Sequence, residues 1–459
     1  MRVSLIMLTT LLCGVVVGYE LGIFSVIVPT IHKIFKLSFS DLSFIVAVLP
    51  LVAACAAIIS GVCATRIGRR LIIIIGSSLL LLGTLECSVA ESITEFIFGR
   101  LIIAAGIGVM TVIIPLYLVE ISPAQQRGQW VAVFFLAINA GVLFSCLIGS
   151  IFAYLEGWRV VFMLGAFPAT ILTIFCYLLP ESPRWLIING QQGKASQAWI
   201  ELFGSKCAMA IISAMDAVDH RTIYKPLKLF SGHGLRIILL GLLINIFSQA
   251  VGTHAVEAYA TVILQKFNVS DTYVDLFSNS MIALVLMSAA LLSIHVIDQF
   301  SRRGMLLLGV SGMVTSLVII TWGLHNLQTD SFMPILILFG SIFFVASQGF
   351  SIAPIAYLLP AEIFPQSLRG VGMGISMAAY WITNTIIVYA FPRLLTDYGA
   401  NLAFLIFLFF TILAWVWIYF NVPETTQISL ECLEKNLQQG LDNRNLGKTE
   451  ELPSWKMVA

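Results

Sequence analysis

The sequence contains little charge: only 11% of its 459 residues are Asp, Glu, Lys or Arg, whereas 59% are hydrophobic. A soluble domain has about 25% charged residues and about 45–50% apolar residues. A chain of this length would need the surface of about three soluble domains, and it has too few charges to cover one. The composition therefore excludes a soluble enzyme and predicts a protein whose outer surface faces lipid.

An excess of one charge sign is also missing, since 25 Lys and Arg stand against 24 Asp and Glu. The chain accordingly lacks a polybasic face that could bind nucleic acid. It has no GxxxxGK[ST] sequence, so an ATP-driven pump is not expected. None of the eight cysteines forms a CxxC pair. We therefore expect no disulfide framework, no metal site and no other cofactor.

What the sequence has in abundance is long apolar runs. A helix needs about 20 mostly apolar residues to cross a bilayer. The first run follows Arg2; it is too long for a signal peptide and lacks a small-residue cleavage site, so it is predicted to be a span. Twelve spans are predicted near 4–30, 42–64, 71–89, 96–119, 129–154, 160–179, 236–264, 275–297, 305–324, 333–358, 371–396 and 402–422.

One long polar connection divides these runs into six and six. The predicted fold class is an all-α membrane protein with twelve transmembrane helices in two pseudo-symmetric six-helix bundles. The bundles are expected at 1–180 and 236–424. A cytoplasmic linker with short amphipathic helices is expected at 181–235, and a partly disordered cytoplasmic tail at 425–459.

Lysine and arginine are divided unevenly between the two sides of the membrane. If both termini are inside, the outside loops hold only Lys33, Lys36, Arg159, Lys266 and Arg393. Because positive residues concentrate in cytoplasmic loops, both termini are predicted to be cytoplasmic, with the protein in the cell membrane. An outside loop also contains a glycosylation sequon at Asn268, to which we assign no role.

Charged motifs recur in the same order in the two halves. The first half has GVCATRIGRR (61–70), PLYLVEISPAQQRG (115–128) and PESPR (180–184). The second half has DQFSRR (298–303), AYLLPAEIFPQSLRG (356–370) and PET (423–425). From Glu120 to Glu362, and from Arg127 to Arg369, the offset is 242 residues. Such a repeat is typical of transporters whose substrate site lies near the midplane between the halves.

Together these motifs closely resemble those of the sugar porter family of the major facilitator superfamily, over the whole chain. The resemblance implies alternating access and a cytoplasmic ion-pair network that holds the halves together while the cavity opens outward. Thr65 departs from the family, which often has an acid there, and Ser301 stands in place of a glycine. The inner gate of the first half is therefore expected to be looser. The matching residues are Arg66, Arg69, Arg70, Glu120, Arg127, Glu181 and Arg184 in the first half, and Asp298, Arg302, Arg303, Glu362, Arg369 and Glu424 in the second.

Two charged residues lie deep inside apolar runs: Glu20 in the first span and Arg100 in the fourth. An ionisable group at such depth costs at least about 2.5–3.5 kcal/mol and usually faces a cavity or a partner, so the two are predicted to pair. Proton-coupled sugar porters have an Asp and an Arg at these positions, which implies that Glu20 carries the proton. The alternative is a fixed salt bridge that only joins spans 1 and 4.

The sequence of span 7, FSQAVGTHAVEAY (247–259), resembles the family's QQxxGxNxxxYY, which supplies amides for sugar hydroxyls. Here His254 replaces the asparagine, and it shares a helix face with Glu257. These two residues could form a second proton site, contact a cationic substrate, or only bind each other. In spans 10 and 11 an aromatic platform is kept. The predicted substrate contacts are Gln249, His254, Glu257, Tyr259, Tyr357, Tyr380 and Trp381.

We therefore predict a secondary transporter, not an enzyme: a proton-coupled symporter of a hexose, pentose or polyol that works by alternating access. Its expected partners are the solute, protons and the lipid bilayer, and it is expected to act as a monomer. A facilitative uniporter of the same fold, an organic-ion transporter and a non-transporting nutrient sensor remain the alternatives.

Overall fold

The computed structural model describes residues 2–36, 39–153, 157–216, 232–257, 259, 271–326, 332–439 and 441–447, and every regular element in these ranges is a helix. The sequon at Asn268, most of the loop before it and the chain after residue 447 lie outside the described residues. The first half and linker contain α1 (Arg2–Phe35), α2 (Phe39–Ile67), α3 (Arg69–Val89), α4 (Ile93–Ile121), α5 (Arg127–Ala153), α6 (Trp158–Leu178), α7 (Pro183–Ile188) and α8 (Gln192–Asp216).

The second half follows the linker. Its helices are α10 (Gly232–Ala250), α12 (Asp271–Val296), α13 (Arg302–His325), α14 (Met333–Phe350), α15 (Ile352–Ile363) and α16 (Arg369–Asn421). The tail forms α17 (Leu430–Gln438) and the short 3-10 helix η1 (Asn443–Asn445).

Ten helices of the described part of the chain are long and apolar enough to cross a membrane. The helix of span 8, α12, joins them as the shorter apolar helix Ser280–Val296. The 53 residues of α16 would be about 80 Å long as one straight helix, but Gly399 (φ 82°, ψ 162°) interrupts them. This break falls in the predicted gap between spans 11 and 12, so α16 supplies two spans and the prediction of twelve is confirmed.

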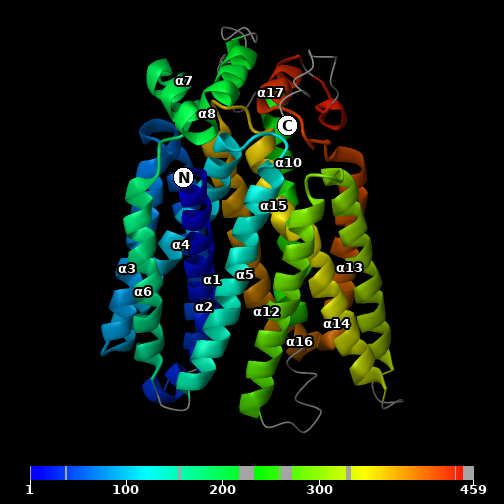
Figure 1. Cartoon of the computed structure of the whole chain (residues 1–459). Coiled ribbons are helices and arrows are strands. Elements are labelled where there is room, and N and C mark those ends of the chain that lie inside the picture. The colour runs from blue at the N-terminus through cyan, green and yellow to red at the C-terminus, as the bar shows by residue number, and fades with distance from the viewer. Residues whose placement is uncertain are drawn as a thin grey trace.

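The helices form two bundles that stand side by side (Figure 1). Helices α1–α6 make one bundle, and α10–α16 make the other. The linker and tail helices α7, α8 and α17 all lie at the same end of the molecule, where α1 also begins (Figure 1). We call this end the linker end.

Two pairs of helices form the main contacts between the bundles: α2 packs on α16, and α5 packs on α12. We call these the α2–α16 seam and the α5–α12 seam. In the α2–α16 seam the backbones come very close, because a Cβ on Gly61 would lie 2.3 Å from the carbonyl oxygen of Gly370. In the α5–α12 seam, a Cβ on Gly128 would lie 2.3 Å from a carboxylate oxygen of Asp298.

Two spans that the sequence presents as continuous apolar runs are broken. Gly252 (φ 87°) separates α10 from the helical turn at 253–257 in span 7. Ser351 (φ −121°, ψ −78°) separates α14 from α15 in span 10. Discontinuous helices in corresponding parts of a transporter place free backbone ends at the substrate site. Both breaks lie in the second half, close to the predicted substrate contacts.

The tail is more ordered than expected. Residues 425–439 and 441–447 lie against the linker end, so this stretch of a tail that was expected to be partly disordered is ordered. Helix α17 begins at Ser429, whose hydroxyl accepts a hydrogen bond from the N–H of Cys432. Leu430, Leu433 and Leu437 form one buried face of α17, which is the pattern of an amphipathic helix.

Candidate functional site

The carboxylate of Glu20 and the guanidinium of Arg100 meet inside the first bundle. Oε2 of Glu20 lies 3.5 Å from Nη1 of Arg100, which also donates to the backbone oxygen of Glu20 at 3.3 Å. Oε1 of Glu20 accepts a hydrogen bond of 2.7 Å from the hydroxyl of Thr84. All three side chains are buried. The structure therefore brings the two predicted charges together and adds Thr84 as a partner.

This pair is only partly satisfied. The guanidinium of Arg100 lies over the ring of Phe24, 4.8 Å from its centroid. Its Nε is buried and has no hydrogen-bond partner among the described residues. A contact of 3.5 Å is longer than the 2.7–2.9 Å of a strong charge-assisted hydrogen bond. Glu20 is thus held by one hydroxyl and one long ion pair, an arrangement that a change of protonation can alter.

The predicted network gathers at the linker end, and its first-half part surrounds Glu120. Arg69 binds Glu120 with two hydrogen bonds, Nε to Oε2 at 2.9 Å and Nη2 to Oε1 at 2.7 Å. Glu181 accepts from the backbone N–H groups of Arg69 at 2.9 Å and Arg70 at 3.2 Å. A carboxylate there stabilises the N-terminus of α3 through the helix dipole. Ser182 completes the set, because its hydroxyl donates to Glu120 at 2.5 Å.

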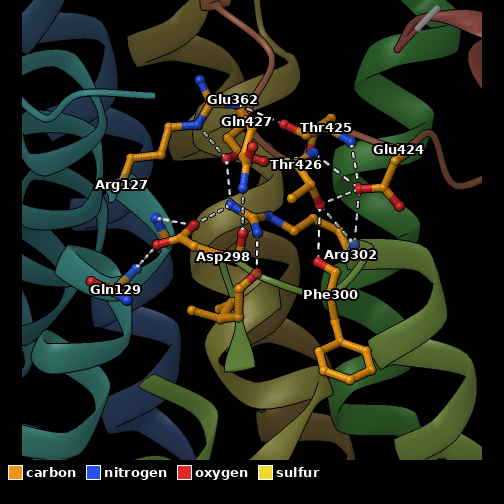
Figure 2. A network of polar contacts seen from close by, with 12 residues as sticks. Arg127, Gln129, Asp298, Phe300, Arg302, Glu362, Glu424, Thr425, Thr426 and Gln427 are labelled. Carbon is orange, nitrogen blue, oxygen red and sulfur yellow. Dashed lines mark hydrogen bonds and ion pairs between the residues drawn. The ribbon is translucent and has the colours of Figure 1, made fainter. Parts of the chain in front are cut away.

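The second half repeats this arrangement around Glu362. Nη2 of Arg302 lies 3.5 Å from Oε1 of Glu362. Glu424 accepts from the N–H of Arg302 at 2.9 Å and of Arg303 at 3.4 Å, as Glu181 does at α3. The hydroxyl of Thr425 donates to Glu362, in the role that Ser182 has in the first half (Figure 2). The sequence repeat thus holds for the hydrogen bonds of Glu424 and Thr425, whereas Arg302 lies farther from Glu362 than Arg69 does from Glu120.

Contacts across the α5–α12 seam are charged. Nε of Arg127 lies 2.5 Å from Oε1 of Glu362 in the other half. Asp298 accepts from the backbone N–H of Gly128 at 3.1 Å and of Gln129 at 2.8 Å, and it binds Arg302 at 2.7 Å (Figure 2). The carboxylate of one half therefore caps the first helical turn of α5 in the other half.

At the α2–α16 seam, the position that matches Asp298 holds no acid. The hydroxyl of Thr65, which occupies the repeat position of Asp298, donates to the carbonyl of Gly61 in its own helix at 3.1 Å. Helix α16 begins without a side-chain cap. Arg369, the counterpart of Arg127, donates to the carbonyl oxygen of Phe364 at 3.0 Å. The first repeat thus lacks a counterpart of Asp298, the acid through which the second half binds the N-terminus of α5 in the first half.

Most other predicted network residues have partners at the linker end. Arg70 donates to the carbonyl oxygen of Tyr177 at 2.5 Å, and Arg303 donates to that of Tyr419. Arg184 pairs with Glu431 of α17, a residue that sequence reasoning missed. Arg66 is exposed, and no polar contact joins it to the described part of the chain. The structure therefore does not bring Arg66 into the network.

The aromatic platform lies where the two halves meet. The rings of Tyr357 and Tyr380 are 6.2 Å apart, and Trp381 packs edge-on against Tyr380 at 5.1 Å. The Tyr380 side chain lies close to those of Tyr357 and Gln249. Nε1 of Trp381 donates to the hydroxyl of Thr111, in α4 of the first half, at 3.4 Å. Four of the predicted substrate contacts therefore form one group that reaches both halves.

An amide that sequence reasoning missed belongs to the same group. Nδ2 of Asn384 donates to Oε1 of Gln249 at 3.1 Å, and both side chains are buried. Asn384 lies one turn after Trp381 inside the apolar run of span 11. A polar side chain within a membrane span is a functional signal by itself, so this residue could have been found from the sequence.

The three remaining predicted contacts lie after the break at Gly252. Nδ1 of His254 lies 3.1 Å from Oε2 of Glu257, so the predicted pair is formed; the His254 side chain is 43% exposed. Tyr259 packs instead against the ring of Phe404, with centroids 5.1 Å apart. The break therefore divides the predicted substrate contacts of span 7 into Gln249 on one side and the His254–Glu257 pair on the other.

Comparison with known proteins gives consistent matches over the whole chain. Residues 6–437 match the family described as "Sugar (and other) transporter". The chain is 30% identical to the glucose transporter GlcP of Staphylococcus epidermidis, covering 95% of this chain and 97% of that protein. It is 28% identical to the major myo-inositol transporter IolT of Bacillus subtilis, covering 94% of each protein.

Solved structures of the xylose transporter XylE from Escherichia coli share the fold. The structure of this proton:xylose symporter bound to 6-bromo-6-deoxy-D-glucose has a TM-score of 0.85 and 25% identity, and the match covers 94% of this chain and 98% of that chain. Its inward-open conformation has a TM-score of 0.68 and 26% identity, with 93% and 98% covered. The lower similarity to the inward-open conformation agrees with a linker end that ion pairs hold closed.

Proposed function

The chain belongs to the sugar transporter family of the major facilitator superfamily, and from this premise we propose that it is a proton-coupled symporter of a sugar or polyol. The observation that carries the coupling is the buried pair of Glu20 and Arg100. A membrane protein has no structural need for two charges at that depth, because an apolar pair would cost less. Their retention is explained if one of them exchanges a proton during transport.

Proton binding would act through the partners of Glu20. While the carboxylate is ionised, it attracts Arg100 and accepts the hydrogen bond from Thr84. A proton on Glu20 removes the attraction to Arg100, which then keeps its charge without a counterion. The rearrangement that follows favours a different packing of α1 against α4. Since proton and solute each stabilise one of two states, their transport is coupled through that equilibrium.

The substrate side of the proposal rests on the group around Tyr380. Aromatic faces and a few amides are the usual means of binding a sugar ring and its hydroxyls. Here Gln249 and Asn384 bind each other, so a hydroxyl of the solute would replace or bridge that hydrogen bond. Each neutral hydrogen bond contributes about 0.5–1.5 kcal/mol. A small polyhydroxylated solute bound mainly by aromatic contact fits this group.

The same proposal includes the orientation and organisation of the chain. The linker end faces the cytoplasm, because the loops on that side hold most of the arginines. The two bundles, residues 1–180 and 236–424, rock against each other about the central group. The linker at 181–235 and the tail at 425–459 stay on the cytoplasmic side. The protein acts as a monomer in the cell membrane.

The direct test is Glu20→Gln, which keeps the shape of the side chain and removes the site for the proton. At a membrane potential of ~150 mV, one coupled proton supports roughly 300-fold accumulation of solute. In vesicles with an imposed gradient, the unaltered protein should accumulate labelled solute. The variant should only equilibrate it while still exchanging internal for external solute. Glu91→Gln, at an exposed acid between α3 and α4, is the matched control and should accumulate normally. Accumulation by Glu20→Gln would disprove the coupling role.

Facilitated transport and organic-ion transport are the competing functions. A facilitative uniporter would take up solute at a rate and to a level that an uncoupler does not change. The partly exposed His254–Glu257 pair favours an ionic solute, because a charged pair can bind a cation or anion directly. A competition panel of sugars, inositols and organic ions separates these cases. Inhibition of uptake by organic ions, but not by sugars or inositols, would favour organic-ion transport.

A further inference from the structure

The tail helix α17 places an acid between the two halves. Oε1 of Glu431 lies 3.2 Å from Nη2 of Arg184, and only 19% and 12% of these side chains are exposed. Arg184 also donates to the carbonyl oxygen of Val119 at the end of α4, which fixes it to the first bundle. Helix α17 packs on α15 of the second bundle. The ion pair of Glu431 and Arg184 therefore joins the two halves.

Arginines from three helices face the Glu431 carboxylate. Besides Arg184 of α7, Arg369 at the start of α16 and Arg127 at the start of α5 are close enough to stabilise its charge. Burial raises the pKa of the carboxyl. Attraction to Arg184, a hydrogen bond from its own backbone N–H, and then attraction to Arg369 and Arg127 outweigh burial and hold the pKa below its ordinary value. The ionised form of Glu431 is therefore favoured where it lies.

Glu431 lies near the part of the seam where the first repeat lacks an acid. Asp298 binds the N-terminus of α5 and supplies negative charge at the α5–α12 seam. The repeat position at the α2–α16 seam holds Thr65, and the buried Arg369 beside it makes no ion pair among the described residues. A buried arginine needs acids close by, and the acids that act on Arg369 are Glu120 of the first half and then Glu434 and Glu431 of the tail. Two of these three acids therefore come from α17.

We propose that Glu431 is a positioning residue of the linker-end gate, which pairs with Arg184 in the closed state and, together with Glu434, supplies negative charge from the tail where the first repeat has Thr65 instead of an acid. The proposal rests on alternating access, the family's mode of transport. It depends neither on proton coupling nor on the identity of the solute. The tail of this transporter is then part of its gate.

Hydrogen–deuterium exchange of the purified full-length chain in lipid nanodiscs tests this without any solute. The reporters are the first turns of α5 (127–131) and α16 (369–374), which are largely buried in the closed linker end and should exchange faster when it opens. Glu431→Gln should raise the exchange rate of both segments about fivefold, a usual size for coupling between sites. Asp442→Asn is the matched control. Asp442 lies in the same tail and forms an exposed pair with Arg236 of α10, and its loss should leave the exchange of both segments unchanged.

A second variant keeps the test decisive if Glu431→Gln folds poorly. Thr65→Asp restores an acid beside Gly370 and should slow the exchange of segment 369–374. Combined with Glu431→Gln, it should return both segments to the rates of the unaltered protein. Faster exchange confined to 430–438 in Glu431→Gln would overturn the proposal, because the residue would then only anchor the tail. Unchanged exchange at 369–374 in Thr65→Asp would overturn it as well. Since no flux is measured, failure to find a transported solute does not affect either result.

Discussion

The two seams between the bundles close in different ways. The α5–α12 seam ends in charged contacts, where Asp298 caps α5 and Arg127 pairs with Glu362. The α2–α16 seam ends in close backbone packing of Gly61 against Gly370, with a threonine where the other seam has an acid. The duplicated motifs thus preserve the contacts within each half but not those between halves. Closure of the α5–α12 seam depends on charged contacts, and closure of the α2–α16 seam depends on the small volume of its glycines.

Added volume at the α2–α16 seam should have the largest effect. In Gly61→Val, the new Cβ would lie 2.3 Å from the oxygen of Gly370 and 3.0 Å from Cα of Gly374. Overpacking of this kind costs about 1–3 kcal/mol, so the closed linker end should be populated up to about 100-fold less. Initial uptake rates at matched surface expression should fall accordingly. Gly193→Val, at a position in α8 with no atoms within 4 Å of a Cβ, should transport normally. Full uptake by Gly61→Val would show that this seam does not need to close.

Loss of charge at the α5–α12 seam should have the next largest effect. Asp298→Asn keeps the size of the side chain but weakens its bonds to the N–H groups of Gly128 and Gln129 and to Arg302. Hydrogen bonds to a charged group contribute about 1.5–3 kcal/mol, so a shift of about tenfold toward the open linker end is expected. This shift is measured by the ratio between the apparent affinities for solute added on the two sides of the membrane.

Thr65→Val is the matched change at the other seam. Its hydroxyl binds only within its own helix among the described residues, so the affinity ratio should change less than twofold. An effect as large as that of Asp298→Asn would show that the two seams close by similar contacts, against the contrast drawn above.

The smallest expected effect is a pH dependence of the docking of α17, which packs on α15 near the start of α16. Burial raises the pKa of Glu434 in α17 to about 7, although Arg369 lowers it; its Oε2 accepts from the N–H of Gln366 at 3.2 Å. The docked tail therefore binds a proton more readily than an undocked tail with the ordinary carboxyl pKa. Docking should be strongest below that ordinary value and should weaken as pH rises through 7, by about 1 kcal/mol between pH 6 and pH 8.

Exchange of segment 430–438, corrected for the intrinsic effect of pH, measures this dependence. Glu434→Gln should remove it while leaving the helix docked. A protection factor that is constant from pH 6 to pH 8 in the unaltered protein would mean that Glu434 does not change its surroundings when the tail undocks. The pKa values of Glu431 and Glu434, the two acids of α17, would then differ less than their surroundings indicate.

Much of the molecule could be predicted from composition and repeat. The twelve spans follow from the length of the apolar runs, because a bilayer imposes one length on every crossing helix. The meeting of Glu20 and Arg100 was also predictable, since two isolated charges in hydrocarbon are stable only near each other. The positions of Glu120, Glu181, Glu362 and Glu424 beside arginines follow from the same repeated motifs.

Other features were only partly readable from local patterns. Thr84 and Asn384 stand out in the sequence as polar residues inside apolar runs, but only the packing of distant spans shows what they bind. The break of span 10 falls at Ser351, although the nearest glycine in the sequence is Gly349. Glu431 lies in a polar segment that reads as disordered, because α17 is stabilised by a face that becomes buried only when it docks on the bundle.

The sequence by itself determined that this chain crosses a membrane twelve times as a duplicated six-helix unit, because hydrophobic length and repeat offset are properties of the linear chain. Only the tertiary structure decided which charges meet across the seams and that the tail reaches the first half. Those contacts depend on distances between residues that are far apart in the chain, and the free energy of an ion pair depends on that distance and on burial, which no local pattern encodes.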